Sequence, residues 1–271
     1  MPPPRESPLT PDAVRLDGRV AVVTGAAVGI GRAIATAFAR FGADVALCDR
    51  DAEQLASAAA ECAASGATVS TAVLDVRVGT DVAAFVADVG TRHQRIDVLV
   101  NNAGGGFFAP FLDVNDKGQD SLVRENFVSV TNFVRACVPH MHDGGSIITI
   151  TSIEAHRAGP GFAVYSAMKA AVTNLSMSLA LELGDRAIRV NCIAPDVIPT
   201  PGIGPDIPVK TPLPYAGHVD DVAGAAVFLA SDLSRFVTGT TIHVDGGNGA
   251  AGGWGRSAAG GFVTAGDPLV T

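Results

Sequence analysis

Short apolar runs alternate with longer helical patterns along nearly the whole chain, and this alternation limits the possible fold more than any other feature. The apolar runs lie at 19–24, 43–48, 68–73, 96–100, 146–152, 188–193 and 241–244, and helical patterns at 30–41, 52–64, 81–89, 120–138 and 219–230. Strands that alternate with helices form βαβ units and a parallel sheet. Because the runs are apolar throughout, both faces of that sheet should be covered. We predict one doubly wound α/β domain with about seven strands.

The length of 271 residues fits one large α/β domain, and no linker divides the strands. Residues 1–16 are Pro-rich and polar, which predicts a flexible arm, and the domain should span 17–271. Residues 195–214 contain seven prolines, which exclude a regular helix, so we expect a substrate lid there. The Gly- and Ala-rich tail from Gly246 fits three roles: a cap on a neighbouring subunit, a cover over the site, or a loose end.

Charge and composition exclude several classes of function. The net charge is −8 and no basic run is present, so nucleic acid is not an expected partner. The four cysteines form no CxxC pair and the six histidines lack ligand spacing, so we expect reduced thiols and no metal site. No secretory signal and no run of eighteen apolar residues occurs, which predicts a cytoplasmic protein without a membrane span.

One pair of residues, with a serine upstream, indicates chemistry. Tyr165 and Lys169 lie four residues apart in a helical pattern that ends near Leu183, so they share one helix face. A nearby cation favours the phenolate, which makes Tyr165 a usable general acid/base. Ser152 closes a predicted buried strand, where open α/β sheets bind their ligands. Taken alone, an incidental Tyr beside a Lys with its ammonium in solvent explains the pair equally well.

A glycine-rich turn follows the first predicted strand and opens the first helix. It runs from Thr24 to Gly31 and places Gly25, Gly29 and Gly31 around Val28 and Ile30. Glycines there allow a tight turn and let a pyrophosphate approach the backbone at the helix N-terminus. In this strand–turn–helix context the motif strongly indicates dinucleotide binding.

Acidic residues at two strand ends bear on the choice of cofactor. Asp49, eighteen residues after Gly31, is placed to accept hydrogen bonds from ribose hydroxyls and to repel a 2′-phosphate. This favours NAD over NADP, although Arg50 could meet a phosphate. Asp75, beside Val76, is placed to reach the adenine edge, and it also fits an ordinary turn.

Two further features contain asparagine. Asn101-Asn102-Ala103-Gly104 follows the fourth predicted strand and also suits a simple turn. Asn126 lies within a predicted helix, where an amide is mildly unfavourable without an assigned partner.

Together, these motifs resemble the short-chain dehydrogenase/reductase family in order and spacing from about residue 17 to 247. The resemblance implies a Rossmann-type domain, a homotetramer or homodimer, and hydride transfer between nicotinamide and an alcohol or carbonyl. It implies that Tyr165 exchanges a proton with the substrate oxygen, that Ser152 hydrogen-bonds that oxygen, and that Asn126 holds a water in a relay from Lys169. Lys169 would also bind the nicotinamide ribose and lower the pKa of Tyr165. The cofactor-binding set would be Gly25, Val28, Gly29, Ile30, Gly31, Asp49, Asp75, Val76, Asn102, Ala103, Gly104, Tyr165, Lys169, Pro195 and Thr200.

One position departs from the family pattern. The pattern Pro-Gly-x-Ile-x-Thr becomes Pro195-Asp196-Val197-Ile198-Pro199-Thr200 here. Thr200 matches the position that contacts the nicotinamide carboxamide. The carboxylate of Asp196 in place of glycine could reshape the loop or face the substrate.

The groove beside these residues should accept a fairly apolar substrate. Apolar side chains gather there, namely Phe107, Phe108, Phe162, Val197 and Ile198, although such residues are more often ordinary packing. Glu154 and His156 follow Ser152 and either contact a polar end of the substrate or are solvated. We therefore predict an NAD-dependent secondary-alcohol dehydrogenase for a steroid-like or alicyclic alcohol. The alternatives are an NADP-dependent 3-oxoacyl reductase and a nicotinamide-binding scaffold without catalysis.

Overall fold

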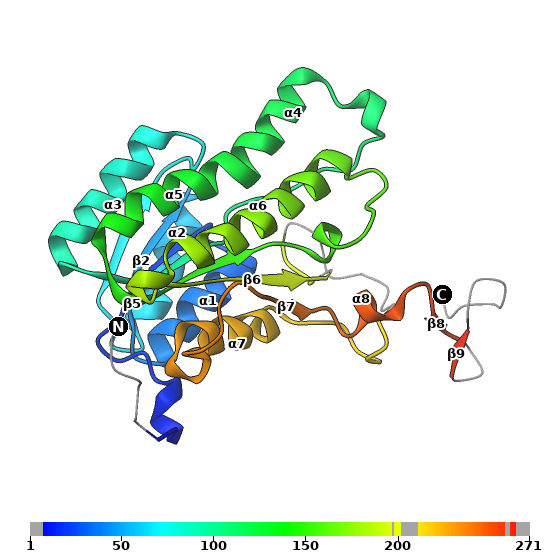
Figure 1. Cartoon of the computed structure of the whole chain (residues 1–271). Coiled ribbons are helices and arrows are strands. Elements are labelled where there is room, and N and C mark those ends of the chain that lie inside the picture. The colour runs from blue at the N-terminus through cyan, green and yellow to red at the C-terminus, as the bar shows by residue number, and fades with distance from the viewer. Residues whose placement is uncertain (1–7, 197, 202–210, 258–260, 264–271) are drawn as a thin grey trace.

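A seven-stranded parallel sheet organises the chain in the computed structural model, which describes residues 8–196, 198–201, 211–257 and 261–263 (Figure 1). Its strands are β1 (Val20–Thr24), β2 (Asp44–Asp49), β3 (Val69–Val73), β4 (Ile96–Asn101), β5 (Met141–Ile150), β6 (Arg189–Pro195) and β7 (Thr241–Val244). The main helices are α1 (Gly29–Arg40), α2 (Ala52–Ala63), α3 (Gly79–His93), α4 (Asp116–Val123), α5 (Ser129–Cys137), α6 (Ala163–Glu182) and α7 (Val219–Ala230). The predicted doubly wound Rossmann-type fold is confirmed.

The strand order places the functional edge. The order is β3-β2-β1-β4-β5-β6-β7, so the chain first builds outward from β1 and then crosses to β4. In open α/β sheets this reversal leaves a crevice beyond the carboxyl ends of the strands, where ligands bind. The crevice here lies at the ends of β1 and β4.

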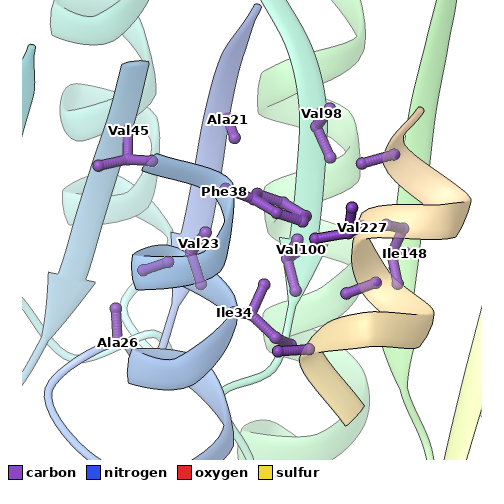
Figure 2. Close-up of a cluster of buried hydrophobic side chains, with 14 of the residues drawn as sticks. Ala21, Val23, Ala26, Ile34, Phe38, Val45, Val98, Val100, Ile148 and Val227 are labelled. Atoms are coloured by element: carbon purple, nitrogen blue, oxygen red, sulfur yellow. The ribbon is translucent and has the colours of Figure 1, made fainter. Parts of the chain in front are cut away.

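Two apolar layers enclose the sheet. On one face, Phe38 and Ile34 of α1 pack against Val227 of α7 and the strand residues Val23 and Val100 (Figure 2). On the other face, side chains of α3, α5 and α6 cover the sheet through a second buried cluster that includes Phe85, Phe133 and Val172. The inner strands β1, β4 and β6 are buried from both sides, as their apolar runs predict, whereas the edge strands β3 and β7 are partly exposed.

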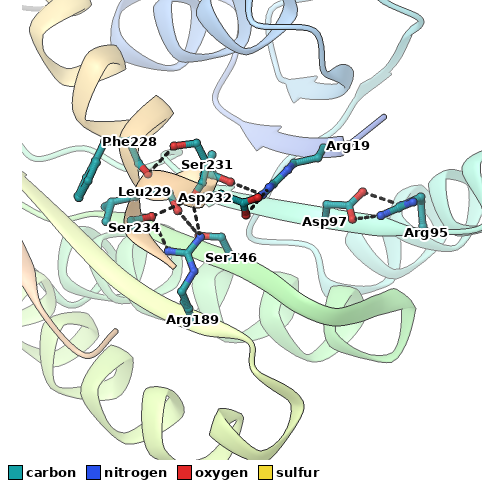
Figure 3. Close-up of polar contacts among 11 residues, drawn as sticks. Arg19, Arg95, Asp97, Ser146, Arg189, Phe228, Leu229, Ser231, Asp232 and Ser234 are labelled. Atoms are coloured by element: carbon teal, nitrogen blue, oxygen red, sulfur yellow. Dashed lines mark hydrogen bonds and ion pairs between the residues drawn. The ribbon is translucent and has the colours of Figure 1, made fainter. Parts of the chain in front are cut away.

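A polar network joins the amino ends of the strands, away from the crevice (Figure 3). Arg189, at the start of β6, donates hydrogen bonds to the Ser234 hydroxyl and the Leu229 carbonyl, each at 2.8 Å. Arg19, just before β1, forms a 2.8 Å ion pair with Asp232. These contacts tie the segment after α7 to the sheet.

The helix predicted over 120–138 is interrupted. It consists of α4, one π-helical turn at Arg124–Val128 and then α5. A π turn adds one residue per turn and often occurs at functional sites. Periodicity could not reveal it, because one turn of five residues is shorter than the window over which a helical period is read.

The two ends of the chain and the lid are described only in part. Of the predicted arm, residues 1–7 lie outside the described residues. The rest includes a 3₁₀ turn at Pro11–Val14, and Leu16 is fully buried, so this part of the arm packs on the domain. Position 197 and positions 202–210 of the predicted lid also lie outside the described residues. The tail forms the short helix α8 (Asn248–Ala251) and a two-stranded antiparallel pair, β8 (Gly255–Arg256) with β9 (Phe262–Val263).

Candidate active site

Helix α6 brings Tyr165 and Lys169 to the carboxyl edge of the sheet, one turn apart. The Lys169 Nζ lies 5.5 Å from the centre of the Tyr165 ring and donates a 2.9 Å hydrogen bond to the Ile150 carbonyl at the end of β5. Ser152 lies two residues beyond β5, rather than within the strand as predicted, and its hydroxyl hydrogen-bonds to Tyr165. The structure therefore brings the three predicted catalytic residues together.

Burial governs the titration of this group. Desolvation raises the pKa of Tyr165, the Ser152 hydrogen bond lowers it, and the Glu154 carboxylate raises it. The expected lowering by Lys169 is not what this structure shows, because desolvation outweighs the other effects. Lys169 is only 5% exposed, and burial lowers its pKa from 10.5 to about 8. An ammonium with that pKa can lose and regain a proton near neutrality.

Asn126 lies in the π turn and is 1% exposed. Its amide donates to the carbonyls of Gly105 and Leu122, both at 2.9 Å, and its Oδ1 accepts a 3.1 Å hydrogen bond from the Gly105 amide. A methyl group on Gly104 would lie 2.8 Å from Asn126 Oδ1 and 3.2 Å from Lys169 Nζ. Asn126 and Lys169 therefore meet across Gly104.

The glycine-rich turn has the shape that a dinucleotide requires. A side chain on Gly31 would come within 2.1 Å of the Gly25 carbonyl oxygen and 2.4 Å of the Asn102 amide. Asn102 holds the turn by donating 3.0 Å hydrogen bonds to the carbonyls of Thr24 and Gly25. Gly25 and Gly29 have positive φ angles of 65° and 60°. The backbone is thus left bare at the N-terminus of α1, which fits a pyrophosphate.

The remaining predicted cofactor residues surround this turn. Val28 is 40% exposed at the N-cap of α1, Ile30 is half-buried, and the amide of Ala103 donates to the Thr24 hydroxyl at 2.9 Å. Asp49 ends β2, and its carboxylate accepts a 3.0 Å hydrogen bond from the Ala27 amide inside the turn.

Asp75 has a partner that the sequence reading did not assign. It forms a 2.5 Å ion pair with Arg77, which lowers the pKa of Asp75, while neighbouring Val76 is buried. Arg50 also contributes to the lowered pKa of Asp75. Arg50, whose guanidinium could meet a 2′-phosphate, therefore lies near the carboxylate of Asp75 as well as beside Asp49.

The segment after β6 reaches the glycine-rich turn. Pro195 is the last residue of β6, and a side chain on Gly29 would lie 3.2 Å from the Cγ2 atom of Thr200. Thr200 therefore packs over the turn that precedes α1. Asp196, between the two, is 9% exposed and pairs with Arg157 at 3.6 Å.

Sequence reasoning missed part of the polar wall on the substrate side. Arg157 bonds to Glu154 at 3.0 Å, and Asn248 of α8 donates a 2.6 Å hydrogen bond to Asp196. The rings of His156 and His243 lie 4.7 Å apart, and burial followed by the charge of His243 lowers the pKa of His156. The pair Glu154 and Arg157 could have been found from their spacing of three residues. Asn248 could not, because nothing in a Gly-rich tail indicates which strand end it meets.

Aromatic side chains line the opposite side of the groove beside Tyr165. The ring of Phe162 lies 5.7 Å from that of Phe108 and 6.3 Å from that of Tyr165, both edge to face. Phe107 and Phe108 are 44% and 71% exposed. Such exposure of large apolar rings beside Tyr165 offers a surface for an apolar ligand.

Two features are absent from the described residues. No helix there is long and apolar enough to cross a membrane. In the same part of the chain, no three His, Cys, Asp or Glu side chains are grouped so that they could hold a metal ion.

The fold and the site together define a nicotinamide-dependent oxidoreductase, and comparisons with known proteins agree. Residues 25–248 match the family model described as enoyl-(acyl carrier protein) reductase. The gluconate 5-dehydrogenase of Gluconobacter oxydans (strain 621H) is 38% identical over 252 residues, which cover 88% of this chain and 97% of that protein. The 3-oxoacyl-(acyl-carrier-protein) reductase FabG of Thermotoga maritima is 37% identical over 244 residues, covering 86% and 99%.

A solved structure extends the likeness to three dimensions. It is a 7α-hydroxysteroid dehydrogenase complexed with NADH and 7-oxo glycochenodeoxycholic acid, with a TM-score of 0.84 and 33% identity over 89% of this chain and 98% of that one. The chain belongs to the short-chain dehydrogenase/reductase family.

Proposed function

We propose that the protein is an NAD-dependent dehydrogenase that interconverts a secondary alcohol and a ketone. The observation that carries this proposal is the meeting of Ser152, Tyr165 and Lys169 beside the glycine-rich turn. A scaffold that had lost its chemistry would have no need of this arrangement. We assign catalysis to these three residues and Asn126, and cofactor binding to the residues around the turn, Asp49, Pro195 and Thr200.

The side chains divide the work of alcohol oxidation. When bound, the nicotinamide accepts the hydride. Because its raised pKa keeps Tyr165 protonated near neutrality, the Tyr165 oxygen takes the proton of the substrate hydroxyl as it passes its own proton toward Lys169. The Ser152 hydroxyl, which bonds to Tyr165, orients the substrate oxygen. Lys169, whose pKa is about 8, exchanges a proton near neutrality, and Asn126 meets it across Gly104. These two residues fit a relay that returns protons to solvent.

Asp49 supports NAD as the cofactor. Its carboxylate lies at the end of β2 against the glycine-rich turn, where a ribose 2′-phosphate would be repelled. The neighbouring Arg50 lies near Asp75, which further balances its charge. The similarity to FabG keeps an NADP-dependent 3-oxoacyl reductase as the second candidate.

The aromatic side of the groove supports an alicyclic or steroid-like substrate. Phe108, Phe162 and Tyr165 form a row of edge-to-face rings that offers a flat apolar body a surface next to the reacting oxygen. The similar 7α-hydroxysteroid dehydrogenase acts on such a body. The gluconate 5-dehydrogenase relative makes a polyhydroxylated acid the contrasting substrate class.

The proposed assembly rests on the resemblance to the family. A homotetramer or homodimer fits the exposed apolar side chains of α6, where Met177 is 45% and Leu181 is 84% exposed. Size-exclusion chromatography with light scattering would measure the subunit number. A cytoplasmic location stays a prediction.

The decisive test combines cofactor titration with a substrate panel. Nicotinamide fluorescence should show tighter binding of NADH than of NADPH. With NAD, the protein should then oxidise cyclohexanol or a hydroxysteroid faster than gluconate. A preference for NADPH with reduction of a 3-oxoacyl thioester would replace this proposal by the reductase. Binding of a cofactor without turnover of any of these substrates would favour the scaffold, and binding of neither cofactor would contradict all three readings.

A further inference from the structure

One buried carboxylate connects three segments that are distant in the sequence. Asp196 follows β6, and its side chain is 9% exposed. Its Oδ1 lies 3.6 Å from Nη2 of Arg157, in the segment after Ser152. Its Oδ2 accepts a 2.6 Å hydrogen bond from Nδ2 of Asn248, the first residue of α8. Asp196 therefore ties the tail to the edge of the candidate active site.

The contacts continue from Arg157 to the serine. Glu154 Oε1 accepts hydrogen bonds from Nη2 and Nε of Arg157 at 3.0 Å and 3.3 Å. The backbone amide of Glu154 in turn donates a 3.1 Å hydrogen bond to the Ser152 hydroxyl. A continuous series of polar contacts thus leads from Asn248 through Asp196, Arg157 and Glu154 to Ser152.

The turn that presents Asn248 is itself fixed. Asp245 accepts hydrogen bonds from the amides of Gly247 and Gly249 at 2.9 Å and 2.8 Å. The rings of His156 and of His243 in β7 lie 4.7 Å apart and are tilted by 58°, so the segment after Ser152 also contacts the strand that precedes this turn. The tail is therefore held in register with the segment after Ser152 before Asn248 makes its own contact.

The energetic consequence follows from the burial of Asp196. A carboxylate removed from water is stable only if ion pairs and hydrogen bonds replace its hydration. Arg157 and Asn248 supply those partners, so the tail must be docked for the charge to be accommodated. A glycine at this position, as in the family pattern, could make neither contact.

We propose that Asp196, Arg157 and Asn248 form a latch that makes helix α8 a working part of this active site. The latch positions two segments. One carries Ser152, and the other carries Thr200, which packs against the glycine-rich turn. Asp196 and Asn248 act as positioning residues. The effect of the latch on kcat can be tested only if the proposed dehydrogenase function is right, whereas the docking of α8 can be tested without it.

The structural test uses the only tryptophan of the chain. Trp254 lies six residues beyond Asn248, is 54% exposed, and its backbone amide donates a 2.9 Å hydrogen bond to the Ala251 carbonyl of α8. Its emission anisotropy therefore reports whether α8 is docked, with or without turnover. Release of the latch should lower that anisotropy.

The experiment compares Asn248→Ala, Asn248→Asp and the exchange Asp196→Asn/Asn248→Asp with the wild type. Asn248→Ala should lower kcat about tenfold, the effect of one charge-assisted hydrogen bond, with the NADH Kd within about twofold. Asn248→Asp should lose more activity because two carboxylates then face each other. The exchange should recover most of it, since an asparagine at position 196 can accept from Arg157 while donating to the carboxylate then at position 248. Asn174→Ala, on the exposed side of α6, is the matched control.

Lower anisotropy and kcat in Asn248→Ala, with recovery in the exchange, support the latch. Wild-type kcat and anisotropy in Asn248→Ala, or an exchange no better than Asn248→Asp, overturn it. If the wild type oxidises no alcohol, the proposed function fails and the anisotropy series alone decides on the latch. If Asn248→Asp does not fold by circular dichroism, Asp196→Gly takes its place and should show the same loss of anisotropy.

Discussion

Buried polar groups are hydrogen-bonded at the amino edge of the sheet, whereas several at the carboxyl edge have no partner that the structure describes. At the amino edge, Arg189 and Ser146 both bond to the Leu229 carbonyl at 2.8 Å, and Arg189 also bonds to Ser234 (Figure 3). At the carboxyl edge, neither amide atom of Asn101 has a partner among the described residues. The same holds for Oε2 of Glu154 and the hydroxyl of Ser166.

This difference separates stability from function. Of the five buried side-chain atoms without a partner in the described part of the chain, four lie at the carboxyl edge, and only the Ser70 hydroxyl lies elsewhere, in β3. Native proteins satisfy most of their buried polar groups, so unpaired ones mark places where a ligand or water belongs. Polar groups at the amino edge should therefore control unfolding, and those at the carboxyl edge should control turnover.

The largest expected effect removes one oxygen at the carboxyl edge. Tyr165→Phe deletes the proposed acid/base and should lower kcat about a thousandfold, within the usual range for general acid–base catalysis. NADH affinity and the unfolding midpoint should stay near the wild-type values, because the ring still packs against Phe162. Steady-state kinetics, NADH titration and urea unfolding check this. Retained turnover would remove Tyr165 from the mechanism.

The converse change affects the amino edge. Arg189 is 8% exposed, and Arg189→Met leaves the Ser234 hydroxyl and the Leu229 carbonyl without this donor, which should cost about 3 kcal/mol of unfolding free energy. Activity of the folded fraction should not change. Arg92→Met, in an exposed pair with Asp88 on α3, is the control and should cost less than about 1 kcal/mol. Equal losses in the two variants would contradict the comparison.

Much of the fold was predictable from the sequence. Short apolar runs predicted every strand of the large sheet, and they are nearly continuous in β1 and β4, where burial on both faces requires them. The helix α7 and the strand β7 begin and end where predicted. The π turn at Arg124–Val128 was not predicted, because a single turn is too short for its side-chain period to be distinguished from that of an α-helix.

The site was predictable only where local chemistry defines it. Glycines followed by a helix indicate a phosphate-binding turn, and Tyr165 and Lys169 share a helix face by spacing alone. The contact between Asp196 and Asn248 joins residues 52 positions apart, and its partner Arg157 comes from a third segment. Such contacts depend on how strand ends meet in space, which no sequence period encodes.

A smaller effect should appear as pH dependence at Lys169. Its folded pKa of about 8 lies below the ordinary 10.5, because burial disfavours the ammonium. Between these values the unfolded chain binds more protons at this site than the folded protein does. The contribution of Lys169 to stability therefore rises with pH in this window. Relative to Lys169→Met, the wild type should gain about 2 kcal/mol of unfolding free energy from pH 7 to 10.

The comparison with Lys169→Met isolates this contribution. Burial raises the pKa values of the Cys48 and Cys137 thiols, so both proteins lose stability above about pH 9, where the unfolded thiols deprotonate. That loss cancels in the difference between the two proteins. Urea unfolding at one-unit pH intervals measures it. A difference that stays flat from pH 7 to 10 would mean that Lys169 keeps an ordinary pKa in the folded protein.

The smallest expected effect is on cofactor choice at Asp49, which lies at the carboxyl edge but is hydrogen-bonded like the groups at the amino edge. Asp49 lies at the carboxyl edge, yet its carboxylate accepts hydrogen bonds from the backbone amides of Ala27, Arg50 and Asp51. If satisfaction alone decided the role of a polar group, Asp49→Ala would change stability only. We expect it also to lower the ratio of NADPH Kd to NADH Kd about tenfold, because the charge facing the ribose is removed.

Two neighbouring variants separate these contributions. Asp49→Asn keeps an oxygen for the backbone amides but removes the charge, so it should shift the cofactor ratio with less loss of stability than Asp49→Ala. Asp51→Ala removes the N-cap of α2, which accepts a 3.0 Å hydrogen bond from the Gln54 amide, and should lower stability without changing the ratio. An unchanged ratio in Asp49→Asn would mean that its charge does not face the ribose. Hydrogen-bond satisfaction alone would then predict the role of Asp49, which would contribute to stability and not to the choice of cofactor.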